Sequence, residues 1–134
     1  MTDEATLVIV KPDAVRRGLI GEILGRIERK GLRIDAMGMM RIDRELADRH
    51  YEEHQDKAFF GELVDFITSG EVVVARVVGE QAVSVVRALM GPTDPATAPP
   101  GTIRGDYGVV ITENLVHGSD SSESAKRELD LFFG

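Results

Sequence analysis

The sequence has 134 residues and carries 16 basic and 23 acidic side chains, for a net charge of −7. This length suits a single domain over residues 1–134, the absence of Cys excludes a disulfide scaffold, and the net acidity makes nucleic acid or an anionic membrane unlikely as a main partner. No apolar run is long enough for a signal peptide or a membrane span, so we expect a cytoplasmic protein.

The first third of the chain is predicted to alternate strands and helices. The β-branched run Thr6 to Val10 indicates a buried strand that ends in a turn at Lys11-Pro12-Asp13. Apolar residues between 20 and 27 have the spacing of an amphipathic helix, and Gly31 follows as a stop signal. Residues 34–42 alternate in the way that is typical of a strand with one buried face.

The middle of the chain is predicted to hold three helices and one strand. Asp43 is the expected N-cap of a helix that carries Tyr51, and a second helix covers residues 60–67. Val72 to Val78 is the most strand-like segment of the sequence. Helical spacing returns over residues 82–89.

The last third opens with a loop from Gly91 to Gly105 that contains four of the five prolines. Its apolar residues show neither helical nor strand periodicity. A patternless loop of this length is usually functional. Tyr107 to Thr112 and Leu115 to His117 are predicted to be extended, and Asp120 to Glu123 has the form of a capping box for a final helix. This order allows either a doubly wound parallel sheet or helices packed on an antiparallel sheet.

His117 is the strongest candidate for a chemical role, because it ends a predicted strand just before Gly118 and a capped helix. An imidazole can attack phosphorus when a carboxylate holds one ring nitrogen and leaves the other free. Glu128, on the core-facing side of the final helix, is the candidate carboxylate. The alternative is that His117 is a structural histidine and Glu128 a surface residue.

Three basic residues, Lys11, Arg87 and Arg104, lie where an element ends or a loop begins. Phosphoryl transfer needs fixed positive charge around the migrating group, and these three residues could supply it together. Taken singly, each could instead solvate the end of its own element. The sequence has neither a P-loop nor a Gly-x-Gly-x-x-Gly motif, so a nucleotide would have to bind by another route.

His50 and His54 are four residues apart, a spacing that could bring two imidazoles to one helix face as metal ligands. The sequence offers no Cys and no obvious third ligand for them. We therefore predict no metal site built from side chains.

The segment Asn114-Leu-Val-His-Gly-Ser-Asp120 resembles the active-site signature of nucleoside diphosphate kinases, Asn-x-x-His-Gly-Ser-Asp, in which the histidine is phosphorylated. The similarity runs from about Thr6 to Phe132. It also covers Val10 to Asp13, Arg17 to Glu22, His50-Tyr51, Phe59-Phe60, Ser69-Gly70 and Pro100 to Asp106.

The resemblance implies a ferredoxin-like α+β fold, with a four-stranded antiparallel sheet covered by helices. It implies transfer of the γ-phosphate of a nucleoside triphosphate to a nucleoside diphosphate through phosphorylated His117, with ping-pong kinetics. Mg²⁺ would be bound mainly through the nucleotide phosphates. The implied partners are nucleoside di- and triphosphates and further copies of the chain, as a hexamer or a tetramer.

The resemblance also implies roles for individual residues. Glu128 would orient His117, Ser119 would assist, and Tyr51 would lie close to the histidine. Phe59 would stack on the base, and any base would be accepted because every base offers a flat face. The phosphates or the sugar would be contacted by Lys11, Arg87, Thr93, Arg104 and Asn114.

Two rival functions remain open on the sequence. A ferredoxin-like regulatory domain would bind nucleotides without turning them over. A nucleic-acid-binding protein would show strong, salt-dependent affinity for a duplex. Only the kinase predicts transfer of phosphate.

Overall fold

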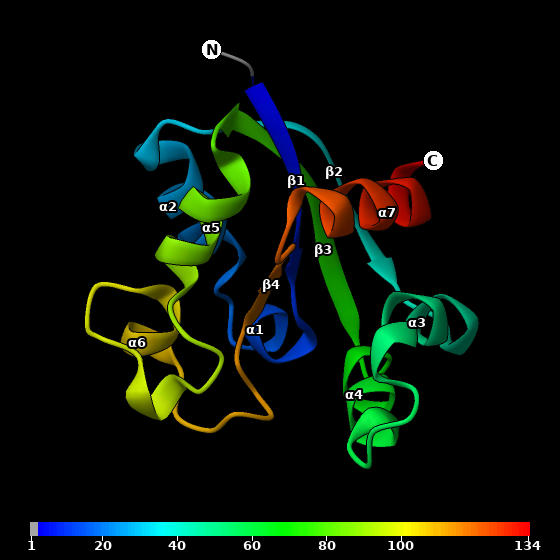
Figure 1. Cartoon of the computed structure of the whole chain (residues 1–134). Helices are drawn as coiled ribbons and strands as arrows, with labels where there is room; N and C mark the ends of the chain where they lie inside the picture. Colours follow the sequence, from blue (N-terminus) through cyan, green and yellow to red (C-terminus); the bar gives the residue numbers. More distant parts are fainter. Residues whose placement is uncertain (1–2) are drawn as a thin grey trace.

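The computed structural model describes residues 3–134, and its four strands form one antiparallel sheet in the order β2-β3-β1-β4 (Figure 1). The strands are β1 (Asp3–Val10), β2 (Arg33–Arg41), β3 (Glu71–Glu80) and β4 (Val116–Gly118). This topology confirms the ferredoxin-like option and excludes the doubly wound parallel sheet.

Helices cover both faces of the sheet. The helices are α1 (Pro12–Arg16), α2 (Ile20–Lys30), α3 (Arg44–His50), α4 (Phe60–Ile67), α5 (Ala82–Met90), α6 (Ile103–Tyr107) and α7 (Ser122–Phe133), with short 3-10 turns η1 (Glu52–His54) and η2 (Pro95–Thr97). Helices α2 and α5 pack on one face, and α3, α4 and α7 pack on the other (Figure 1). In the described part of the chain, no helix has the length and apolar character needed to cross a bilayer.

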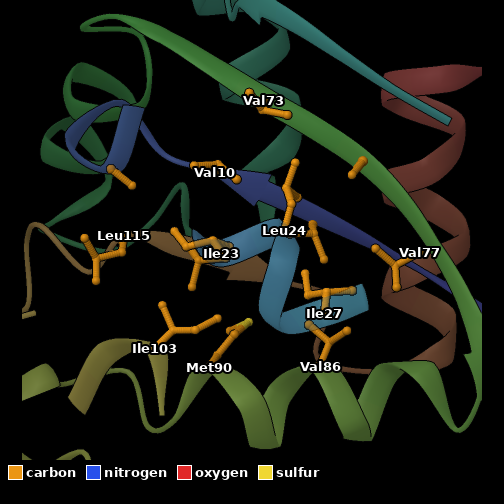
Figure 2. Packing of buried hydrophobic residues seen from close by; sticks show 14 of the residues in the cluster. Val10, Ile23, Leu24, Ile27, Val73, Val77, Val86, Met90, Ile103 and Leu115 are labelled. Carbon is orange, nitrogen blue, oxygen red and sulfur yellow. The ribbon is translucent and has the colours of Figure 1, made fainter. Parts of the chain in front are cut away.

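The two central strands contribute side chains to two separate cores. In β1, Val8 and Val10 face α2 and α5, whereas Leu7 and Ile9 face the other helices. Figure 2 shows the first core, in which Val10 lies among residues from α2 and α5 such as Ile23. Burial on both faces explains the apolar runs at residues 7–10 in β1 and 72–75 in β3, because neither run has a solvent-facing side.

Several predicted helix ends are confirmed. Helix α2 stops at Gly31, whose φ of 108° is the left-handed conformation that a C-terminal glycine permits. The side chain of Asp43 accepts a hydrogen bond from the Leu46 amide at the start of α3. These local signals were readable because they depend on neighbouring residues only.

Three local predictions are wrong. The turn predicted at Lys11-Pro12-Asp13 is the start of α1, with Pro12 in the first helical turn, where its missing N–H costs nothing. The patternless stretch from Gly91 to Gly105 contains η2 and the start of α6. The N-cap of α7 is Ser121, which accepts from the Ser124 amide, so the predicted capping box starting at Asp120 does not form.

The segment from Tyr107 to Thr112 is also not extended as predicted. Tyr107 ends α6, and the following residues form a loop outside the sheet. Val109 is 77 % exposed there, and Val110 and Ile111 are exposed as well. A β-branched run favours a strand, but a strand also needs a neighbour to accept its hydrogen bonds, and this segment pairs with none of the four strands.

Candidate active site

A pocket of about 350 Å³ lies at the end of the sheet where β1 stops beside β4. Every residue that the sequence analysis singled out for the site lines this pocket, except Ser119. The lining side chains come from segments between residues 11 and 128, which only the folded chain brings together. Residues from the long loop and from helices α3, α4, α5, α6 and α7 contribute to the lining.

His117 is held from one side by Glu128. Its Nε2 lies 2.8 Å from Oε1 of Glu128, and the same oxygen accepts a 2.7 Å hydrogen bond from Oγ of Ser119. Burial alone would raise the pKa of Glu128, but the hydrogen bonds from His117 and Ser119 hold that pKa below its usual value. An ionised carboxylate only accepts, so we assign the ring proton to Nε2, which leaves a lone pair on Nδ1.

Ser119 does not line the pocket but supports Glu128 from the protein interior. It is fully buried, and its Oγ also accepts a hydrogen bond from the Leu7 amide at 3.2 Å. This pair of bonds ties the carboxylate of Glu128 to the central strand β1. The serine fixes Glu128, and Glu128 in turn fixes His117.

His50 packs directly against the ring of His117. The two ring centroids are 4.8 Å apart and the planes are nearly perpendicular. Burial, and then the neighbouring His117, lower the pKa of His50 to about 3, so its ring is neutral. His54 does not share its helix face as the sequence suggested, because α3 ends at His50 and His54 belongs to η1.

Lys11 projects into the pocket from the residue after β1. Its Nζ donates a 2.9 Å hydrogen bond to Oδ1 of Asn114. Burial, followed by the positive charge of Arg104, lowers the pKa of Lys11 to about 8. The ammonium group is thus poorly neutralised and attracts an anion.

Arg104 has a structural task as well as a charge. Its guanidinium donates to three backbone carbonyls, those of Asn114, Val116 and Gly91, at 2.7 to 3.1 Å. A guanidinium has five N–H donors, so two remain for a ligand. Burial, and then the nearby Arg87, lower the pKa of Arg104 to about 10. One residue therefore positions the strand that carries His117 and supplies positive charge beside it.

Arg87 and Thr93 complete the polar side of the pocket. Arg87 is an exposed residue of α5 and lies close enough to Arg104 and Asp120 to shift the pKa of each downward. The carbonyl of Thr93 accepts from Nδ2 of Asn114 at 3.2 Å. Asn114 therefore joins Lys11 to the long loop.

An exposed aromatic side chain also lines the pocket. Phe59 is 46 % exposed and lines both this pocket and a neighbouring cavity of about 590 Å³. The second cavity continues past Leu63 to Ile111 and shares Lys11 with the first. Tyr51 is buried in the wall, where burial raises the pKa of its hydroxyl.

Asp13 is a part of the site that the sequence analysis used only as a turn residue. Its Oδ2 accepts a 3.1 Å hydrogen bond from the Leu115 amide, and the Leu115 carbonyl accepts from the Lys11 amide at 2.9 Å. Leu115 has a φ of 76°, which is unusual for a residue with a side chain. These two hydrogen bonds hold the backbone of Leu115, and so position Asn114 before it and His117 after it.

Gly118 lies where β4 approaches α5, and a side chain there would collide with the helix. A Cβ on this residue would lie 2.7 Å from Sδ of Met90 and 2.9 Å from Cγ1 of Val86. The glycine therefore lets β4 pack closely on α5.

Metal-binding side chains gather at one place in the described residues, where His50, His117 and Glu128 meet. That group has two imidazoles and one carboxylate. It is not the oxygen cage that Mg²⁺ needs for binding by protein alone. The cations around it suit phosphate oxygens instead.

The chain is similar to proteins of known activity over nearly its whole length. A family profile described as nucleoside diphosphate kinase matches residues 4–134. The nucleoside diphosphate kinase of Rubrobacter xylanophilus is 64% identical over 131 residues, which are 98% of each chain. That of Archaeoglobus fulgidus is 59% identical over 97% of this chain and 86% of its own.

Two solved structures have the same fold. A halophilic nucleoside diphosphate kinase from Halobacterium salinarum, in complex with CDP, superposes with a TM-score of 0.96 at 54% identity, covering 98% of this chain and 88% of its own. The nucleoside diphosphate kinase of Encephalitozoon cuniculi gives a TM-score of 0.96 at 44% identity, covering 98% of this chain and 89% of its own.

Proposed function

The chain belongs to the nucleoside diphosphate kinase family, and from this membership we propose how its residues carry out the reaction. It is a phosphotransferase that moves the γ-phosphate of a nucleoside triphosphate to a nucleoside diphosphate. His117 is the proposed nucleophile. The observation that carries this assignment is the 2.8 Å contact from Nε2 to Glu128, on a ring that still lines the pocket.

The reaction has two half-steps. In the first, the lone pair on Nδ1 of His117 forms an N–P bond to the γ-phosphorus while the bond from that phosphorus to its bridging oxygen breaks, and the diphosphate leaves with the electron pair. In the second, a terminal oxygen of the acceptor's β-phosphate attacks the phosphorus and the N–P bond breaks. Nε2 keeps its proton throughout and donates it in a hydrogen bond to Glu128, whose negative charge stabilises the positive charge that the ring gains.

We assign the phosphate chain to the polar side of the pocket. Lys11 and the two free N–H groups of Arg104 would neutralise the charge that spreads over the transferring group. Arg87, from α5, would reach the same oxygens from the pocket mouth. Asn114 and Thr93 would hold the sugar or the phosphates, and Tyr51 would support the histidine.

The base would lie on the apolar side, on the exposed face of Phe59. The adjoining cavity has room for a base and offers flat apolar surface. Stacking depends little on which base is present, so this arrangement supports use of many nucleotides.

Enzymes of this family need a divalent metal ion, and we propose Mg²⁺ held mainly by the nucleotide phosphates. When bound, the ion would neutralise charge on the phosphates that Lys11 and Arg104 do not reach. No residue of the chain is assigned to it as a direct ligand.

We further propose a cytoplasmic, single-domain subunit that assembles as a hexamer or a tetramer. Edge strand β2 exposes Met37 and Met39, at 54% and 53%, and the loop after α6 exposes Val109 to Ile111. An open strand edge is a template for pairing with another chain, and exposed apolar side chains mark interaction sites. This reasoning supports assembly of several copies of the chain.

The test of the nucleophile uses the protein labelled from ATP. Protein is incubated with ATP carrying a labelled γ-phosphate, freed of nucleotide and then given GDP. The expected product is an acid-labile, alkali-stable phosphoprotein that passes its label to GDP, and His117→Gln should not take up label. Uptake by that variant would move the nucleophile to another residue, and binding of ATP without uptake would favour a nucleotide sensor.

A further inference from the structure

His50, His117 and Glu128 each place one potential metal-ligand atom within 4.8 Å of the other two. We propose that this triad is a binding site for a transition-metal ion of the zinc type, and that the bound ion inhibits the enzyme. The site is separate from the Mg²⁺ that travels with the nucleotide, because its ligands are protein side chains. The inhibition rests on the proposed role of His117, whereas the binding does not.

The donor set suits zinc. Two neutral imidazoles and a carboxylate are a common protein ligand set for Zn²⁺, with the fourth position left to water. Donors about 2.0–2.1 Å from zinc lie roughly 3.4 Å from one another, so the widest gap in the triad has to close by about 1.4 Å. The proposal requires rotation of the three side chains to supply that movement.

One ring nitrogen of His50 is left without a hydrogen-bond partner in the part of the chain that the structure describes. The residue is 5% exposed, and its Nδ1 is a buried polar atom without a hydrogen-bond partner among the described residues. Such an atom is costly unless something binds it. His50 also lines the pocket that His117 lines, so an ion can enter from solvent.

The charges around the triad select the kind of ion. Lys11, Arg87, Arg104 and Arg127 line the same pocket and repel any cation. A hard ion such as Mg²⁺ gains little from imidazole and would not overcome this repulsion. Zinc bonds strongly to imidazole nitrogen, so it alone of the two should enter.

A bound ion would remove the nucleophile from the reaction. Either it takes the ring nitrogen that attacks phosphorus, or it takes the one that Glu128 holds and so withdraws electron density from the ring. In the first case the attacking lone pair is occupied, and in the second the proton that Nε2 donates to Glu128 is released to solvent. Phosphate uptake stops while the ion stays.

The binding test exploits the histidine count, because the whole chain has three histidines and no cysteine. Nucleotide-free protein is titrated with Zn²⁺ by calorimetry. We expect one ion per chain, binding at least tenfold weaker in His50→Phe and in His117→Gln, and unchanged binding in the matched control His54→Gln. Millimolar Mg²⁺ should not compete. Equal loss in His54→Gln, or no binding by the unmodified protein, would overturn the proposal.

A second measurement needs no variant. In the unmodified protein, one equivalent of Zn²⁺ should shift the imidazole NMR signals of His50 and His117 and leave those of His54 in place. Shifts confined to His54 would overturn the site even if a His50 variant failed to fold.

The inhibition is tested separately from the binding. Formation of phosphohistidine from Mg-ATP should be lost with the same half-saturating free Zn²⁺ as binding, and a chelator should restore it. Binding without this loss would overturn the inhibitory role. A control measures phosphate uptake from Mg-ATP with zinc removed by a chelator. If the protein binds zinc but takes up no phosphate in this control, the proposed nucleophile is wrong and the metal site still stands.

Discussion

Oε1 of Glu128 lies 2.8 Å from Nε2 of His117, so a carboxylate on α7 sets the proton position of an imidazole on β4. The same oxygen accepts from Ser119, which is itself tied to β1. The nucleophile is therefore oriented by three elements at once. Its geometry does not depend on the substrate being present.

Replacing Glu128 with Gln should lower kcat more than it changes KM. The variant loses a charge-assisted hydrogen bond worth about 1.5–3 kcal/mol, which corresponds to a decrease in kcat of about 10- to 150-fold. Steady-state kinetics with ATP and a nucleoside diphosphate measures the split. The matched control is Glu123→Gln on the exposed side of the same helix, and an equal loss in that variant would count against the orienting role.

Lys11 should make nucleotide affinity depend on pH. Its pKa is lowered to about 8, so the ammonium group is present below pH 8 and is lost as the pH rises through that value. We expect the Kd for ADP to rise by up to about tenfold per pH unit above 8, the limit for one linked proton. Calorimetric titrations at several pH values give the slope. Lys11→Met should bind ADP weakly, and its Kd should not change with pH in this range. The control Lys30→Met, at an exposed position, should keep the pH dependence of the Kd.

Asp13 should be needed for stability and for activity. In Asp13→Ala the Leu115 amide loses its buried partner, which should lower the free energy of unfolding by about 1–3 kcal/mol. The kcat should fall as well, because Leu115 aligns the residues on either side of it. Urea denaturation and kinetics measure the two effects. Asp13→Asn keeps an acceptor oxygen and should lose less, and the exposed Asp48→Ala should stay within about 0.5 kcal/mol of the wild type.

Phe59 should contribute to the binding of every nucleotide by a similar factor. Stacking of one base on an aromatic ring is worth about 1–3 kcal/mol, so Phe59→Ala should weaken binding of ADP, GDP, CDP and UDP about 5- to 150-fold each. Phe59→Trp should retain affinity. A loss confined to one base would show that the pocket reads base edges rather than base faces.

Except for Ser119, which lies behind it, the residues that the sequence analysis chose for the site line one pocket, but their mutual geometry could not be predicted. The motif around His117 pointed to chemistry, and the position of Glu128 on the core side of its helix pointed to a partner. No sequence signal showed that Arg104 spends three donors on backbone carbonyls, since these contacts depend on how the long loop closes. The same holds for the contact between His50 and His117, which joins residues far apart in the chain.

By itself, the sequence determined the features that depend on neighbours along the chain: the helix that ends at Gly31, the cap at Asp43, the apolar central strands and the motif that carries the histidine. The tertiary structure decided the direction of the strands, the loop character of Val109 to Ile111 and the left-handed backbone of Leu115. Hydrophobic periodicity and secondary-structure propensity show whether a segment is buried. The strands and helices that pack against that segment are selected by contacts between residues distant in the sequence. For that reason the order of the sheet and the convergence of the cations appear only once the chain is folded.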